Sequence, residues 1–273
     1  MEQLSLFGGS GPFSSIVKEM GTVKSSNSFW AGNIGAMVGD LTDILGSMKL
    51  SYELSDLHLL SGETTAPPDL ELVKERFLVL QRDLSGRLGA CFAEDVSDEV
   101  ASAGGALLPL PAEMFKLLTR AGAFDDPPPA AKQLGGVGWA PYGYFFREWN
   151  SEISQVLEEF RGELTGVFHK LGSTGVRFEH LEAALHDSIK MRLTELIERV
   201  PQQLEVVFRQ RFVKAKGELG GKVTLQDLER WWEPGEWLAD FIGLLQRGLE
   251  ASLQFQAERV QALVEAALSF DAR

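Results

Sequence analysis

The stretch that decides the fold is FFREWNSEISQVLEEFRGELTGVFHKL, residues 145–171. Its large apolar side chains recur at steps of three and four residues, the period of one face of an α-helix. They are Phe145, Trp149, Ile153, Val156, Leu157, Phe160, Leu164, Phe168 and Leu171. The stripe covers roughly seven helical turns. It predicts a long helix with one buried face, and Gly172-Ser173 predicts its end.

Two further apolar stripes follow this segment. The first begins at Phe178 and continues past Pro201 to Phe212. Proline inside a helix removes a backbone hydrogen bond and clashes with the preceding turn, so Pro201 is expected to kink this helix or to start a new one. The second stripe begins near Glu236 and runs almost to the C-terminus. Three long amphipathic helices in succession predict an antiparallel bundle.

Cap and turn signals separate the predicted helices. Thr224 follows a glycine-rich break and is a favourable N-cap for a short helix, and Asp69 is the predicted N-cap of an earlier one. Pro234-Gly235 predicts a turn before the last helix. No run of alternating β-branched residues bounded by turn residues competes with these patterns. We therefore expect an all-α fold, a bundle of long antiparallel helices with an irregular Gly/Pro-rich central connection.

Composition divides the chain into four parts. Residues 1–28 are rich in Gly and Ser and are expected to form a flexible N-terminal tail. Residues 29–96 are expected to form an N-terminal helical subdomain. Residues 97–141 are a Gly/Ala/Pro-rich connection, expected to be irregular apart from one or two helical turns after Pro111. Residues 142–273 are expected to form the C-terminal helical bundle.

Charge and cysteine content exclude several classes of function. Lys and Arg number 26 against 39 Asp and Glu, which gives a net charge of -13 at pH 7. A field of this sign repels the phosphate backbone, so no nucleic-acid partner is expected. The single cysteine, Cys91, excludes an internal disulfide and a multi-cysteine zinc site. Its apolar and acidic neighbours predict an inert core thiol.

The N-terminal region indicates the compartment. The chain starts without a basic patch followed by an apolar run, so the protein is expected to be cytoplasmic. The most apolar early segment, residues 29–48, is interrupted by Asp40 and Asp43. No direct membrane span is therefore expected.

No arrangement of residues predicts a catalytic site. No Gly-x-Ser-x-Gly elbow follows a strand pattern. The glycine-rich stretches at residues 8–11 and 135–138 lack the Lys-Ser/Thr pair of a phosphate-binding loop. We therefore expect no catalytic residues, no cofactor and no bound metal, and we do not expect an enzyme.

One histidine-rich segment keeps a ligand-binding alternative open. His180, Glu182 and His186 lie close together, and Glu182 and His186 share one face of the predicted helix. This spacing allows one weak cation or small-ligand site. The paired Glu-x-x-His pattern of carboxylate-bridged metal bundles is absent from the sequence. A solvated polar helix face is the more ordinary interpretation.

A cluster of tryptophans is the most unusual local feature. Trp231, Trp232 and Trp237 surround the turn residues 233–236. Indoles at such a corner are expected to close the end of the bundle. The alternative is a protein-docking spot, because exposed tryptophan is enriched where partners bind.

Basic residues gather at Arg209, Arg211 and Lys214 against the acidic background of the chain. Such a run is most often the solvated end of a helix, where cations also suit the negative end of the helix dipole. It is also a candidate for electrostatic docking. Together with the three tryptophans, these residues form the candidate partner-docking site.

Several short motifs occur in a characteristic order in the second half. They are Tyr144-Phe145-Phe146-Arg147, Phe160-Arg161, Leu181-Glu182-Ala183-Ala184-Leu185-His186-Asp187, Val200-Pro201, Arg211-Phe212 and Pro234-Gly235-Glu236-Trp237-Leu238. Their order over about residues 140–270 resembles the uncharacterised proteobacterial helical family named domain of unknown function 3348. Members of that family look like cytoplasmic proteins often encoded beside TolQ/MotA-like and OmpA/MotB-like membrane proteins. The resemblance implies an accessory role near a proton-driven envelope complex and brings no catalytic residues.

These observations predict a non-enzymatic helical interaction or scaffold protein with a protein partner, for which the resemblance implies a membrane-complex component. The alternative is a metal- or small-ligand-binding helical bundle. The amphipathic last helix, with apolar residues around Phe255 and Phe270, also allows pairing with a second copy, so a homo-oligomer is a further expectation.

Overall fold

The computed structural model describes residues 69–93, 106–123 and 129–271. The helices in these ranges are α3 (Leu70–Ala90), α5 (Pro111–Arg120), α6 (Ala131–Lys170), α7 (Gly172–Leu219), α8 (Leu225–Trp232) and α9 (Trp237–Asp271). The described ranges contain no β-strand, so the all-α prediction is confirmed. None of their helices combines the length and the apolar composition needed to cross a membrane. The predictions for residues 1–28 and for the apolar segment 29–48 lie outside the described residues.

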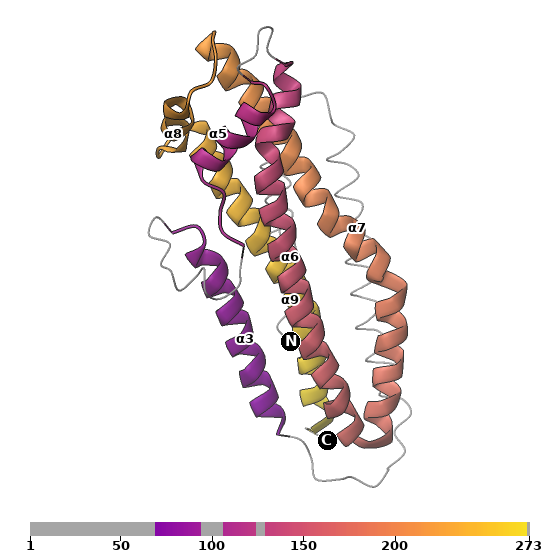
Figure 1. The fold of residues 1–273 in the computed structure, drawn as a ribbon. Coiled ribbons are helices and arrows are strands. Elements are labelled where there is room, and N and C mark those ends of the chain that lie inside the picture. The colour runs from indigo at the N-terminus through magenta and orange to yellow at the C-terminus, as the bar shows by residue number, and fades with distance from the viewer. Residues whose placement is uncertain (1–68, 94–105, 124–128, 272–273) are drawn as a thin grey trace, which may run out of the picture.

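Three long helices set the shape of the molecule. Figure 1 shows α6 and α9 running through the middle, with α7 on one side and α3 on the other. α7 packs mainly on α6, and α3 packs mainly on α9. The short helices α5 and α8 cover one end, which we call the head. We call the remainder of the bundle, down to the turn between α6 and α7, the stem.

α6 begins earlier than the sequence predicts. Residues 97–141 are expected to be an irregular connection, but α6 already starts at Ala131 and continues through Pro141. The expectation is wrong there because tertiary packing outweighs the low helix propensity of glycine and proline. A Cβ atom at Gly138 would lie 3.2 Å from the ring of Phe208 on α7. The glycine therefore lets α6 and α7 approach closely.

The predicted stop and start signals end the helices where the sequence places them. Three glycines at these ends have positive φ angles, which side chains with a Cβ rarely adopt. They are Gly172 with φ 81°, Gly220 with φ 62° and Gly235 with φ 90°. At the start of α3 the carboxylate of Asp69 accepts a hydrogen bond from the backbone N–H of Leu72 at 3.0 Å, as the N-cap prediction requires.

Two prolines behave as the sequence predicts. Pro111 occupies the first turn of α5, where the missing N–H has no partner to lose, and the expected turns extend to a ten-residue helix. Pro201 lies inside α7, which remains one helix from Gly172 to Leu219. Figure 1 shows that α7 is bent. Of the two predicted outcomes at Pro201, the start of a new helix is therefore not observed.

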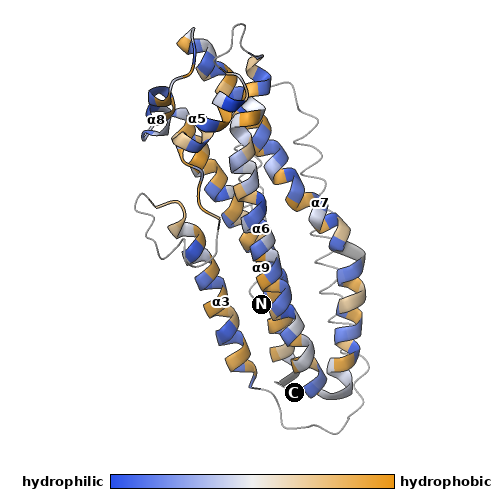
Figure 2. Ribbon diagram, in the orientation of Figure 1, coloured by the Kyte–Doolittle hydropathy of each residue, from blue (hydrophilic) through white to orange (hydrophobic). Residues whose placement is uncertain are grey.

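Buried apolar side chains form two cores. The head core is rich in aromatic residues, and its largest members are Trp139, Tyr142, Phe145, Phe146, Trp149, Phe208, Phe212, Trp231 and Phe241. The stem core includes Leu70, Phe77, Leu84, Ile153, Leu157, Phe160, Leu164, Phe168, Leu253, Val260 and Leu263. Figure 2 shows apolar and polar residues alternating along the stem helices, the pattern of helices with one buried face.

α3 shares the stem core with the long helices. Phe77 and Leu84 are both 1% exposed, and the ring of Phe77 lies 5.5 Å from that of Phe160 on α6. The sequence places residues 29–96 in an N-terminal subdomain. In the part that the structure describes, residues 69–93, the apolar face of α3 is instead buried against α9 and α6.

Candidate functional site

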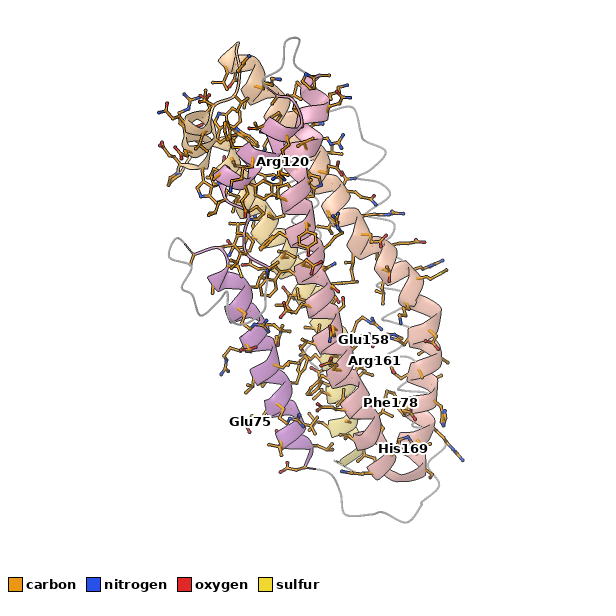
Figure 3. All side chains as sticks on the ribbon, in the orientation of Figure 1. Glu75, Arg120, Glu158, Arg161, His169 and Phe178 are labelled. Carbon is orange, nitrogen blue, oxygen red and sulfur yellow. The ribbon has the colours of Figure 1, made fainter. Side chains whose placement is uncertain are left out.

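Charged side chains from three helices meet inside the stem. This ionic cluster consists of Glu158 and Arg161 from α6, Glu182 and His186 from α7, and Arg259 from α9. Residues three or four apart share one face of a helix, so α6 and α7 each direct two members to the same place. Figure 3 shows Glu158 and Arg161 between α6 and α7. Glu182 is 7% exposed and His186 is 3% exposed, so these two side chains lie in the interior, whereas Glu158 is exposed.

Arg161 joins the two carboxylates of the cluster. Its Nε donates to Oε2 of Glu158 at 2.9 Å, and its Nη1 donates to Oε2 of Glu182 at 2.7 Å. Burial opposes the charge on Arg161, but these hydrogen bonds and the two carboxylates outweigh it and raise its pKa. For Glu158, burial is the largest single cause and opposes the charge, but the hydrogen bond from Arg161 and the nearby positive charges together outweigh burial and lower the pKa. Arg161 is therefore a fixed cation shared between α6 and α7.

Glu182 is the carboxylate whose charge is more costly to bury. Its burial raises the pKa above the ordinary value of glutamate, although Arg161 and Arg259 both favour the ionised form. A buried carboxylate is tolerated only when charge-assisted hydrogen bonds replace its lost hydration. Removing Arg161 would leave Glu182 without its hydrogen-bond donor.

Arg259 contacts His186 rather than a carboxylate. Its Nη2 lies 2.9 Å from Nδ1 of His186, while Nε2 of His186 lies 3.8 Å from Oε1 of Glu158. Burial is the largest cause that lowers the pKa of His186, and the neighbouring cations, led by Arg161, lower it further. Neutral His186 is thus the form that fits the site at neutral pH.

Arg259 is incompletely satisfied. Burial lowers its pKa below the ordinary value of arginine, and the nearby carboxylates of Glu158 and Glu182 only partly oppose this. In the part of the chain that the structure describes, the buried Nε of Arg259 has no hydrogen-bond partner. A guanidinium has five N–H donors and cannot be deprotonated in proteins. It therefore retains capacity to bind an acceptor.

A cavity of about 140 Å³ lies against the ionic cluster. All five members of the cluster contribute to its lining. Lys190, Thr194 and Gln256 add polar groups, and Leu193 and Ile197 belong to its apolar wall. The exposed side chains of Lys190 and Glu158 place one side of the cavity next to solvent.

A polar network continues the cluster towards the head between α6 and α9. Ser154 donates to Oε1 of Gln256 at 2.7 Å, and the amide of Gln256 lies 3.2 Å from Oγ of Ser252 and 3.3 Å from Oδ1 of Asn150. Ser252 is fully buried. These bonds align α9 against α6 on the approach to Arg259, because a shift of one helix along the other would leave buried donors unpaired.

The three residues of the ligand-binding alternative, His180, Glu182 and His186, do not lie together in the structure. Glu182 and His186 are buried in the ionic cluster, whereas His180 is exposed. The guanidinium groups of Arg161 and Arg259 repel a cation from this place. Among the described residues, no group of three or more His, Cys, Asp or Glu side chains is placed to hold a metal ion. The chemistry of the site instead favours hydrogen-bond acceptors and anions.

The tryptophan corner is partly core. Trp231 is 2% exposed and its ring packs at 6.0 Å from Phe212 and 5.3 Å from Trp237. Trp232 and Trp237 are partly buried against the same core. Trp231 therefore closes the head of the bundle, and partner docking at this corner remains a prediction that concerns Trp232 and Trp237.

The basic candidates are already engaged within the chain. Arg209 forms an ion pair with Glu205, and Lys214 is exposed with its Nζ 3.9 Å from Glu218. Arg211 Nη1 lies 3.4 Å from the backbone oxygen of Trp237, which ties α7 to the tryptophan corner. The three basic side chains do not join the ionic cluster of the stem.

Sequence reasoning did not assign Arg161 and Arg259 to a site. A usable signal exists on α9, where Ser252, Gln256 and Arg259 place polar side chains at helical spacing within a strongly apolar helix. Polar residues on an otherwise buried face predict partners inside the bundle. Which residues of α6 and α7 supply these partners depends on helix packing.

Comparison with known proteins gives one family. Residues 111–269 match the family model described as "Protein of unknown function (DUF3348)". The chain belongs to this family. The matched range begins with α5 and contains every residue of the ionic cluster, whereas α3 lies outside the DUF3348 region. No curated protein and no solved structure matches the chain.

Proposed function

We propose that this DUF3348 chain is a non-enzymatic helical interaction protein that binds a protein partner along the outer face of α3. We define this face by Leu72 and Val79, which are 51% and 55% exposed. Leu72 and Val79 are seven residues apart and point away from the side that buries Phe77 and Leu84. This pair of exposed apolar side chains on one face is the observation that carries the proposal.

The spacing on α3 suits a helical partner. Apolar residues seven apart follow the seam of two packed helices, as in coiled coils and helix-in-groove complexes. Charged residues of both signs flank the seam, including Glu75, Arg76 and Asp83. Such flanking charges set the orientation of a partner more than the affinity. The proposed partner therefore presents an amphipathic helix to α3.

The proposed class of partner rests only on the resemblance to DUF3348, whose matched range, residues 111–269, does not include α3. DUF3348 resemblance implies work beside TolQ/MotA-like envelope complexes, so we propose that the partner is a cytoplasmic segment of such a complex. The net charge of -13 supports association with a basic segment, because opposite charges accelerate encounter. On this proposal the protein works in the cytoplasm as an accessory component.

The test is affinity purification from native cells at near-physiological salt, after mild cross-linking. The full chain is compared with a variant carrying both Leu72→Glu and Val79→Glu. Met191→Glu on α7 is the matched control, because Met191 is 76% exposed and lies outside the proposed face. We expect one partner to co-purify with the wild type and the control, and to be lost with the double variant.

Two outcomes would overturn the proposal. One is purification of the wild-type chain alone, without a stoichiometric partner. The other is retention of the same partner by the double variant, whose helix content and melting temperature are checked against the wild type. Trp232→Ala adds a parallel test of the tryptophan corner, and light scattering of the wild type tests the predicted homo-oligomer.

A further inference from the structure

The cavity in the stem is lined by a cation, Arg259, whose hydrogen-bond donors are only partly satisfied by the described residues. The guanidinium of Arg259 donates one hydrogen bond, to a neutral imidazole, and forms no ion pair with a carboxylate in the described part of the chain. Glu158 and Glu182 are bonded to Arg161 instead. A buried charge is costly unless it is paired. Arg259 can therefore bind an anion that the described residues do not supply.

The charge balance of the lining favours a monoanion. Glu158 and Glu182 balance Arg161 and Arg259, and burial keeps His186 neutral by lowering its pKa. Lys190 also lines the cavity and leaves one positive charge in excess. A cation would meet two guanidinium groups and an ammonium group. A ligand with one negative charge would neutralise the site.

The walls and the size of the cavity define the rest of the ligand. Leu193, Ile197, Phe255 and Leu263 contribute apolar surface. The volume of about 140 Å³ is close to that of engineered protein cavities of roughly 150 Å³ that accept benzene. A body no larger than a six-membered ring therefore fits. Inorganic phosphate would leave the apolar wall uncovered.

We propose that the cavity between α6, α7 and α9 binds a small organic monocarboxylate. Its carboxylate accepts hydrogen bonds from guanidinium N–H groups of Arg259 that His186 does not occupy. Two parallel hydrogen bonds from a guanidinium to a carboxylate give both strength and direction. Lys190 approaches from the solvent side, and the apolar body of the ligand lies against Leu193 and Ile197. This site is independent of the outer face of α3.

Benzoate is the probe for this proposal, because it joins one carboxylate to a six-membered ring. Benzyl alcohol is the neutral probe of nearly the same shape, and inorganic phosphate is the anion without an apolar body. Each is titrated into the full chain by isothermal calorimetry and by NMR at pH 7.5. We expect saturable benzoate binding with a Kd of about 1 mM or tighter, and at least tenfold weaker binding of both comparison probes.

Variants assign the binding to the cavity. Arg259→Gln is expected to weaken benzoate binding at least tenfold, and Arg259→Lys to restore part of it as a single point charge. Arg247→Gln is the matched control, since Arg247 is exposed on the same helix and does not line the cavity. Lys190→Gln is expected to weaken binding about threefold. Because Lys190 is exposed, this variant gives a result even if Arg259→Gln does not fold.

The small-anion proposal is wrong if benzoate fails to bind at about 10 mM, or if benzyl alcohol binds equally well. It is also wrong if benzoate binding is unchanged in both Arg259→Gln and Lys190→Gln. Loss of a co-purifying protein in Arg259→Gln, without benzoate binding to the wild type, would assign the cavity to a partner's carboxylate instead. Loss of partner binding through α3 leaves this test unaffected, so the two proposals fail separately.

Discussion

The guanidinium of Arg259 on α9 lies 2.9 Å from Nδ1 of His186 on α7. Guanidinium nitrogens only donate hydrogen bonds, so Nδ1 must be the acceptor. This assigns the proton of the neutral imidazole to Nε2, the nitrogen on the side of Glu158. One contact thus sets the tautomer of His186 and joins two helices that are far apart in the sequence.

The burial of His186 predicts a stability that depends on pH. Burial lowers its pKa in the folded state, so the unfolded chain takes up the proton first. This stabilising contribution is complete above about pH 6.5 and is lost as pH falls from there towards the lowered pKa. Relative to His186→Gln, we expect the wild type to lose at most about 1.4 kcal/mol of unfolding free energy for each unit by which the pH falls. Urea titrations between about pH 7.5 and 5.5 measure it.

The comparison with His186→Gln isolates this histidine from its neighbours. Glu158, Arg161, Lys190 and Arg259 all affect its pKa. The raised pKa of Glu182 acts in the opposite sense, because protonation of Glu182 at low pH relieves the cost of burying its charge. These groups are present in both proteins, so their direct contributions largely cancel. His180→Gln, an exposed histidine on the same helix, is the control, and an equal pH slope in both variants would contradict the prediction.

Gly162→Ala on α6 is expected to stabilise the protein by about 0.5–1 kcal/mol. A Cβ atom at Gly162 meets no neighbouring atom within 4 Å, so alanine gains helix propensity without a clash. Gly143→Ala is the contrasting variant on the same helix, because its Cβ would lie 2.9 Å from the indole of Trp139. We expect a lower melting temperature for Gly143→Ala. Stabilisation by both changes would show that the head core is looser than the structure indicates.

Thr224→Ala is expected to cost about 1 kcal/mol through loss of the N-cap of α8. Thr224 accepts from the backbone N–H of Asp227 at 3.2 Å, and the Asp227 carboxylate accepts from the backbone N–H of Thr224 at 2.9 Å. The hydrogen bonds from Thr224 also lower the pKa of Asp227. Chemical denaturation measures the cost. Thr119→Ala, at an exposed threonine in the last turn of α5, should cost clearly less.

Phe208→Ala is expected to destabilise the protein by about 3–5 kcal/mol, because it leaves a cavity in the aromatic head core. Phe208 is fully buried and its ring lies 5.1 Å from that of Phe241 and 5.6 Å from that of Tyr142. Met191→Ala, at an exposed position of the same helix, should change stability by less than about 0.5 kcal/mol. Differential scanning calorimetry of both variants checks the contrast, and equal melting temperatures would refute it.

Local signals in the sequence predicted most of the helices. The apolar stripe of residues 145–171 is buried as expected, and Asp69 and Thr224 cap helices where the sequence places them. These signals involve residues within one or two turns of each other. The early start of α6 at Ala131 escaped prediction, because its glycines and Pro141 disfavour a helix locally and only packing against α7 compensates.

The site was predicted only in part for the same reason. The pair of Glu182 and His186 was recognised on one helix, but as ligands for a cation. Arg161 on α6 and Arg259 on α9 make the site favour an anion instead of a cation. Neither arginine lies near Glu182 and His186 in the sequence. Burial also divides residues that look equivalent in the sequence, since Trp231 is core while Trp232 is partly exposed.

The sequence by itself determined the all-α class, the positions of the turns and the net negative charge, because periodicity, caps and composition are local or additive properties. Only the tertiary structure decided which polar faces meet, how the two cores are divided and which cation has no carboxylate partner among the described residues. Helices that bury apolar stripes can pack in several registers that the stripes alone do not distinguish. The register observed here brings Arg161, Glu182 and Arg259 from three helices around one cavity.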